Sequence, residues 1–189
     1  MYKQEPRLLP GDFAIWIFIF AELLVFGIFF ITYAVVRAQN VELFNHYQLT
    51  LNRETGAINT LLLITASYFV VLAVNSIKKN NIKRCYQFIY AAIFCGGIFL
   101  IIKTFEFYEK FSHGINISTN DFYFFYFSLT IFHYLHVILG MIILLAVAIK
   151  AQCLNYSSEN YTGVETGGAY WHMVDLVWII LFPLIYIIR

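Results

Sequence analysis

Five apolar stretches, each long enough to cross a lipid bilayer, make up most of this chain and limit it to one kind of fold. They run over about residues 13–36, 57–77, 85–108, 122–149 and 168–188. A spanning helix needs about 20 consecutive, mostly apolar residues, and only helices and closed barrels satisfy their backbone hydrogen bonds within lipid. The pattern predicts an all-α integral membrane protein, a bundle of five transmembrane helices.

The composition leaves little chain for a domain outside the membrane. The sequence is 61% hydrophobic and 12% charged, whereas soluble domains average about 25% charged residues. The longest polar connection, residues 38–56, is expected to be a loop, so we predict a single transmembrane domain over residues 1–189. The net charge of +1 without a basic patch argues against nucleic acid as a partner.

The distribution of Lys and Arg predicts the orientation, because basic residues are enriched in cytoplasmic connections. The side that holds the N-terminus has seven of them: Lys3, Arg7, Lys78, Lys79, Lys83, Arg84 and Lys150. The other side has four: Arg37, Arg53, Lys110 and Arg189. We therefore expect a multi-pass membrane protein with the N-terminus in the cytoplasm and the C-terminus outside.

Charged side chains inside the apolar stretches each need a physical reason, since a charge within a bilayer costs a few kcal/mol or more. Glu22 lies near the middle of the first stretch. It could be a hydrogen-bonded carboxyl that holds two helices together, or a group on the lipid or proton side of a pathway. Lys103 and Glu106 are three residues apart and can pair on one helix face. We expect a local ion pair near the interface, with Lys103 extending toward the headgroups.

Three histidines and an aspartate also lie within predicted spans. His133 and His136 share one face of the fourth span, and His172 and Asp175 share one face of the fifth. A di-iron bundle would show Glu-x-x-His pairs, which are absent here. We therefore interpret the histidines as structural groups bonded to neighbouring helices and not as metal ligands, and we expect the fifth helix to face protein partners.

Four motifs, in order along nearly the whole chain, resemble subunit III of the haem–copper oxidases, the third subunit of cytochrome c and quinol oxidases. They are Phe20–Phe26 (FAELLVF), Ile58–Thr60 (INT), Glu106–Glu109 (EFYE) followed by Phe132–Gly140 (FHYLHVILG), and Tyr170–Trp178 (YWHMVDLVW). With five spans, the chain resembles the short bacterial forms without the two extra N-terminal helices of mitochondrial-type subunits. This resemblance implies a location in a bacterial inner membrane. Lys103 and the segment Met173–Pro183 are most similar to the branch associated with nitric oxide reductase, often called NorE.

The resemblance implies an accessory subunit without its own redox centre, haem or metal. Such a subunit binds beside the catalytic, haem-bearing subunit of a nitric oxide reductase or terminal oxidase, holds phospholipid in a cleft, and supports assembly, stability and proton uptake. It assigns Glu22 to the lipid or proton side of the membrane region. It also implies an interhelical polar network formed by Lys103, Glu106, His133, His136, His172 and Asp175.

Two other classes remain open from the residues alone. A small proton-coupled transporter or channel subunit would use Glu22 and Lys103, although the sequence shows no inverted repeat and no pair of broken spans. A membrane metalloenzyme would use His133, His136 and His172, although few further histidines are available as ligands.

Overall fold

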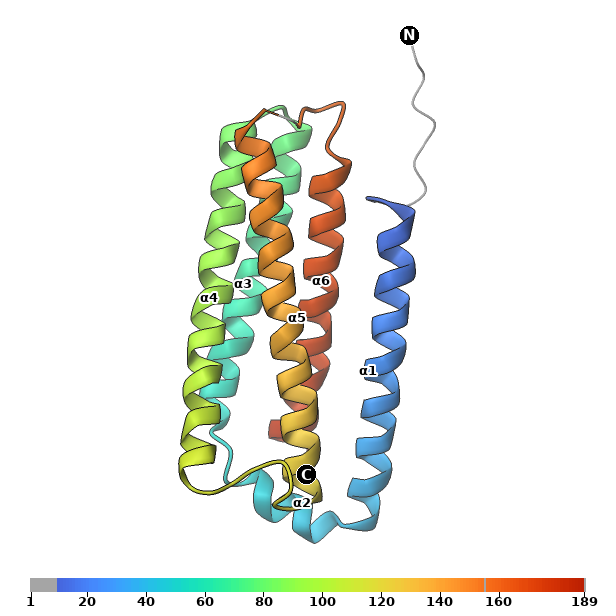
Figure 1. Ribbon diagram of the computed structural model, residues 1–189, viewed down its shortest axis with the longest axis vertical. Coiled ribbons are helices and arrows are strands. Elements are labelled where there is room, and N and C mark those ends of the chain that lie inside the picture. Colours follow the sequence, from blue (N-terminus) through green and yellow to red (C-terminus); the bar gives the residue numbers. More distant parts are fainter. Residues whose placement is uncertain (1–9, 155, 189) are drawn as a thin grey trace.

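The computed structural model describes residues 10–154 and 156–188, and it is helical along almost all of that length. Five helices are long and apolar enough to cross a membrane (Figure 1): α1 (Phe13–Gln39), α3 (Arg53–Lys78), α4 (Ile82–Ser112), α5 (Asp121–Gln152) and α6 (Thr162–Phe182), which continues as the π-helical turn η1 (Pro183–Ile187). The expected all-α membrane bundle is confirmed. Lys3, Arg7 and Arg189, which entered the charge comparison, lie outside the described residues.

The helices extend past the predicted apolar stretches, mostly at polar ends. The largest difference is at α6, which begins at Thr162 instead of near residue 168. The apolar length marks the part of a helix that lipid can surround, whereas the backbone hydrogen bonds continue until a capping group ends them. Asp12 is such a group, because its side chain accepts a hydrogen bond from the amide of Ala14 at 3.2 Å.

The polar connection after α1 is not only a loop, as was predicted, but contains a short helix, α2 (Val41–Gln48). Its Phe44 is buried against rings of two other helices, Tyr33 of α1 and Phe122 of α5. An eight-residue helix is marginal by itself in water, so this packing against the bundle stabilises it. The connection therefore covers one end of the molecule.

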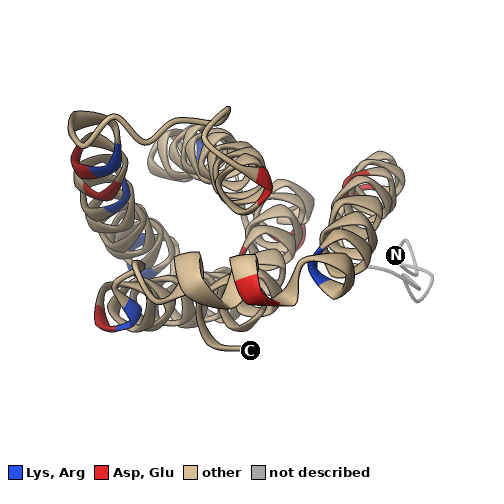
Figure 2. Cartoon of the chain, turned by 90° about the horizontal axis from the view of Figure 1, so that it is seen from below, with Lys and Arg blue, Asp and Glu red and all other residues tan. Residues whose placement is uncertain are grey.

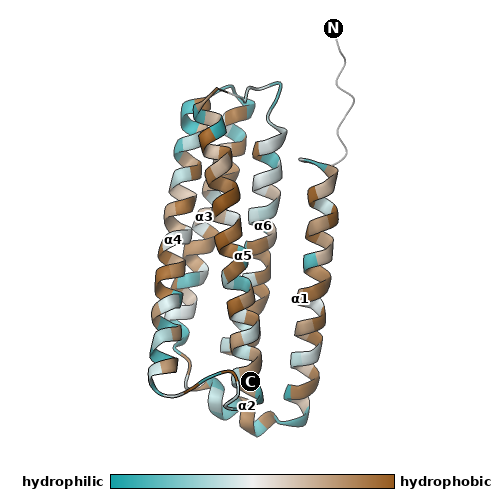
Figure 3. Ribbon diagram, viewed as in Figure 1, coloured by the Kyte–Doolittle hydropathy of each residue, from teal (hydrophilic) through white to brown (hydrophobic). Residues whose placement is uncertain are grey.

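Helices α3 to α6 form a compact antiparallel group, and α1 stands beside it against α5 and α6 (Figure 1). Seen along the helices, α1 lies to one side of the others (Figure 2). Apolar residues cover α1 almost from end to end, while hydrophilic residues gather at the two ends of the bundle (Figure 3). This distribution is the one that a surrounding bilayer would favour.

The centre of the four-helix group is built around tryptophan rings of α6. Trp171 is fully buried between Gly96 of α4 and Gly140 of α5. A Cβ atom at either glycine would lie only 2.9 to 3.0 Å from the indole. Small residues at these two positions therefore let the helices close around a large ring, as small residues commonly do in membrane bundles.

The start of α1, the α3–α4 turn and the α5–α6 connection lie at one end of the bundle, and the other connections and the end of η1 lie at the opposite end (Figure 1). This alternation is the one on which the charge comparison was based. Which end faces the cytoplasm stays a prediction.

Candidate functional site

A fully buried lysine lies at the centre of the most polar cluster of the bundle. Lys103 of α4 donates to Glu106 Oε2 at 3.1 Å and to the hydroxyl of Tyr186 in η1 at 2.6 Å. The hydroxyls of Tyr186 and of Tyr126 in α5 both donate to Glu106 Oε1 at 2.6 Å. We call these four residues the lysine cluster. It joins α4, α5 and η1 and gives both charges several partners.

The predicted ion pair of Lys103 with Glu106 is present, but Lys103 does not extend toward the headgroups as was predicted. Its side chain has no exposed surface, and its Nζ lies between 5.1 and 5.5 Å from the ring centres of Phe107, Tyr126, Trp178 and Tyr186. A carboxylate, two hydroxyls and aromatic faces together replace the water that the ammonium would otherwise seek. Sequence spacing identified the partner Glu106, but not the two tyrosines, which lie on other elements.

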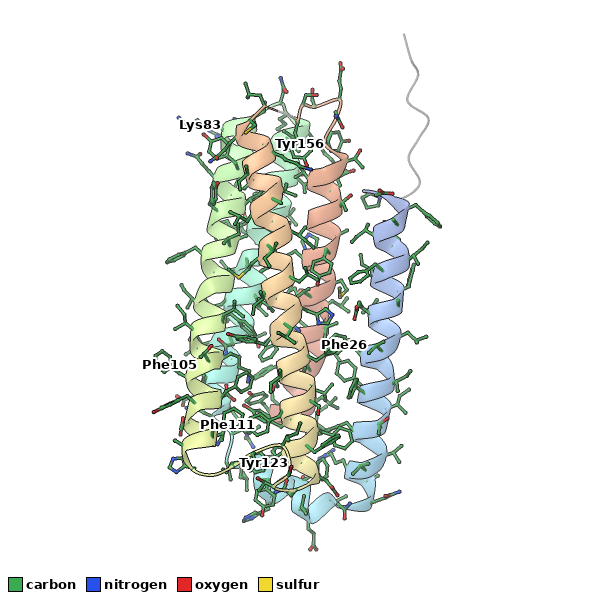
Figure 4. The ribbon with its side chains drawn as sticks, viewed as in Figure 1. Phe26, Lys83, Phe105, Phe111, Tyr123 and Tyr156 are labelled. Atoms are coloured by element: carbon green, nitrogen blue, oxygen red, sulfur yellow. The ribbon has the colours of Figure 1, made fainter. Side chains whose placement is uncertain are left out.

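Glu22 is the polar link between α1 and the four-helix group. Its Oε2 lies 3.0 Å from Nε2 of His136 in α5, whose Nδ1 lies 2.7 Å from the carbonyl oxygen of Phe132. Phe26, one turn further along α1, points toward α5, where its ring meets Phe132 and His136 (Figure 4). Glu22 thus has a protein partner within the span.

His172 and Asp175 of α6 meet α3. His172 Nδ1 lies 2.6 Å from Ser67 Oγ, and Asp175 lies beside the same serine. One oxygen of Asp175, Oδ1, is buried and has no hydrogen-bond partner among the described residues. The shared helix face predicted for His172 and Asp175 is therefore the face toward Ser67.

His133 is placed differently from its neighbour His136. Its ring packs against Trp178 of α6 and Phe99 of α4, with ring centres 5.1 and 5.8 Å away. It is fully buried, and within the described part of the chain neither ring nitrogen has a hydrogen-bond partner. The polar residues of the expected network thus divide into the lysine cluster, the Glu22–His136 pair, the Ser67–His172–Asp175 group and an isolated His133.

A cleft of about 400 Å³ separates α1 from α3 and α6. Its walls are almost entirely apolar, with Trp16, Ile19 and Leu23 from α1 facing side chains of α3 and α6. At one end Glu165 of α6 pairs with Lys78 of α3 at 3.0 Å. The backbone at the start of α1 is tied to the same part of α6.

Two hydrogen bonds make this last attachment. The amide of Gly11 donates to Glu165 Oε2 at 3.4 Å, and the amide of Asp12 donates to Thr166 Oγ1 at 3.0 Å. The cleft is therefore closed by polar contacts at the end where α1 begins. Within residues 10–154 and 156–188, no three His, Cys, Asp or Glu side chains converge as a metal site.

Comparison with known proteins places this arrangement in a family. The family model for cytochrome c oxidase subunit III matches residues 11–189. Cytochrome c oxidase subunit 3 of Thermostichus vulcanus is 31% identical over 182 residues, which cover 91% of this chain and 84% of the relative. Cytochrome bo(3) ubiquinol oxidase subunit 3 of Buchnera aphidicola is 28% identical over 178 residues, with 93% and 85% covered.

A third relative, the probable cytochrome c oxidase subunit 3 of Nocardia farcinica, is 28% identical over 98% of this chain and 91% of its own length. The chain belongs to the cytochrome c oxidase subunit III family. The resemblance inferred from the four sequence motifs is confirmed at the level of this family.

Proposed function

We propose that the chain is a non-catalytic accessory subunit of a haem–copper-type respiratory complex, bound to the catalytic, haem-bearing subunit of that complex. The observation that carries this proposal is the family match over residues 11–189. Haem and metal centres belong to the partner subunits, and this chain supports their assembly, stability and proton uptake. By itself it is not an enzyme.

We propose that phospholipid binds in the cleft between α1, α3 and α6. Apolar walls suit acyl chains, and Lys78 and Glu165 at the closed end offer a cation and an anion to a headgroup. The lipid completes the packing of α1, which has few other contacts with the four-helix group. Phosphorus analysis of the purified chain tests this, and a phosphorus-free, folded protein would contradict it.

In this proposal, polar contacts between the spans have a structural role. These contacts are the Glu22–His136 pair and the Ser67–His172–Asp175 group. They hold α1 and α6 in register, so that the surface offered to the catalytic subunit keeps its shape. Glu22 also keeps a protonatable group on the α1 side of the bundle. We expect Glu22→Gln and Asp175→Asn to lower assembly or coupled turnover, whereas the exposed Glu109→Gln in α4 serves as the matched control.

Within the family, we propose the nitric oxide reductase-associated branch, with a terminal oxidase as the alternative partner. The resemblance of Lys103 and of the segment Met173–Pro183 to that branch supports this choice. The haem types of the co-purified catalytic subunit distinguish the two partners.

The main experiment is co-purification of the tagged chain from its native membrane in mild detergent, followed by a haem spectrum and identification of the bound chains. We expect a haem-bearing core in stoichiometric amount. A haem-free chain that moves protons when reconstituted in vesicles would contradict the proposal and favour a transporter.

We also propose that residues 1–189 form a single transmembrane domain with a cytoplasmic N-terminus. Cys153 offers a direct test of the orientation, since it is exposed at the end of α5, whereas Cys85 and Cys95 are buried. A membrane-impermeant maleimide should label Cys153 in inverted vesicles and spare it in right-side-out vesicles. The reverse pattern would overturn the orientation.

A further inference from the structure

His172 is a hydrogen-bonding side chain in the wall of the apolar cleft. Around it the cleft is lined by Leu23 of α1, Val71 of α3, and Met173 and Leu176 of α6. His172 is partly exposed, in contrast to the fully buried His133. A ligand that consists only of hydrocarbon would leave the polar edge of the His172 ring without a hydrogen-bond partner, which is unfavourable.

The ring of His172 is held in a fixed orientation. Its Nδ1 lies 2.6 Å from Ser67 Oγ, and Asp175 lies beside the same serine. The second ring nitrogen, Nε2, makes no hydrogen bond to any described residue and is not among the buried atoms without a partner. Nε2 is therefore accessible, and the fixed ring offers it to a ligand.

The depth of His172 in the membrane restricts that ligand. His172 follows Glu165 by seven residues on α6, which corresponds to roughly 10 Å along the helix axis. A phospholipid whose headgroup binds at Lys78 and Glu165 would present acyl chain at this depth. A polar atom at the level of His172 must therefore come from a lipid-soluble molecule whose polar head enters the hydrocarbon region.

We propose that the deep end of the cleft binds the ring of an isoprenoid-type quinone or its quinol, with one ring oxygen hydrogen-bonded to His172 Nε2. The inference rests on the lipid cleft proposed above and adds a second occupant. In one tautomer Nε2 donates to a quinone carbonyl, and in the other it accepts from a quinol hydroxyl. On the α1 side the cleft is lined by Ile19 and Leu23. This is a binding site only, and no electron transfer is part of the proposal.

The test uses the purified full-length chain on affinity resin in detergent, titrated with decylubiquinone. Retained quinone is measured by absorbance after extraction, and retained phospholipid is measured as phosphorus in the same samples. We expect saturable retention near one quinone per chain. His172→Phe should weaken binding on the order of tenfold, as expected for one lost hydrogen bond, and His172→Gln should recover part of it. His46→Phe, at an exposed histidine of α2, is the matched control and should bind as wild type does.

The outcomes separate this proposal from the others. Non-saturable retention by the wild type, or equal affinity in His172→Phe, would overturn the quinone site. A parallel loss of phosphorus in His172→Phe would assign His172 to phospholipid and also overturn it. If His172→Phe does not elute as a single species, a competition experiment on the wild type with decylbenzene replaces it. Decylbenzene has a tail and a ring but no oxygens, so it should not displace decylubiquinone, and displacement would overturn the proposal. Failure of co-purification with a haem-bearing core would refute the accessory-subunit proposal and leave this result unchanged.

Discussion

Removing one charge of the lysine cluster should damage the protein far more than removing both. In Glu106→Gln, the Lys103 ammonium stays fully buried without its counter-charge. Removing one partner of a buried ion pair costs about 3–5 kcal/mol, while replacing both partners by groups of similar volume is often close to neutral. The tyrosine hydroxyls cannot compensate, because a glutamine oxygen at this position accepts their hydrogen bonds without carrying charge.

The magnitude follows from the surroundings of Lys103. Its Nζ is enclosed by four aromatic rings within 5.5 Å, so a methionine side chain of similar length would fit and meet soft apolar surfaces. We expect Glu106→Gln to lower the free energy of unfolding by about 3–5 kcal/mol. The double variant Lys103→Met/Glu106→Gln should recover more than half of that loss, or about 1.5–2.5 kcal/mol. The coupling energy is larger than this recovery by the cost of Lys103→Met alone.

The measurement is thermal unfolding of the purified chain in mild detergent, monitored by loss of the monodisperse elution peak. A loss of 3–5 kcal/mol corresponds to a Tm lower by roughly 6–20 °C for a chain of this size. Glu109→Gln, three residues further on the exposed side of α4, is the control and should change Tm by little. A double variant as unstable as the sum of its single changes would refute the reasoning, since it would show no coupling between the two charges.

Two further substitutions test the packing and the end of the bundle. Gly140→Ala should destabilise the protein by about 1–3 kcal/mol, because the new methyl group would lie 3.0 Å from the Trp171 ring. Gly27→Ala is the control, since the space around Gly27 is open, and it should not destabilise the protein. Equal Tm values for the two variants would contradict the close packing at Gly140. Gln48→Met should cost about 1–3 kcal/mol, because the Gln48 amide donates to the carbonyl of Ile185 at 2.9 Å. Unchanged protease resistance of the C-terminal turn in Gln48→Met would count against that role.

The five long helices could be predicted because length and apolar content alone determine whether a segment can span lipid. The short helix α2 could not, because eight residues with Glu42 and Asn45 among them carry no length signal and depend on Phe44 packing against the bundle. The start of α6 was also missed, since its first turn is polar and lies beyond the apolar stretch.

The candidate site was predictable residue by residue but not contact by contact. A charged group in a span needs a partner, and spacing identified Glu106 as the partner of Lys103. The contact between Glu22 and His136 joins residues 114 positions apart, and Tyr186 lies 80 positions from Glu106. Such pairs depend on which helices become neighbours, and helix periodicity contains no information about that.

The distant partners of α1 have a consequence for biogenesis. Glu22 meets His136, Asp12 meets Thr166 and Tyr33 meets the backbone of Leu184, at separations of 114, 154 and 151 residues. Ribosomes add about 5–20 residues per second, so α1 waits roughly 6 to 30 seconds in the membrane before these partners are made. During that interval the Glu22 carboxyl lies in the span without its partner His136. The high apolar content of α1, the greatest of the five spans, is what lets the helix remain inserted until the rest of the bundle arrives.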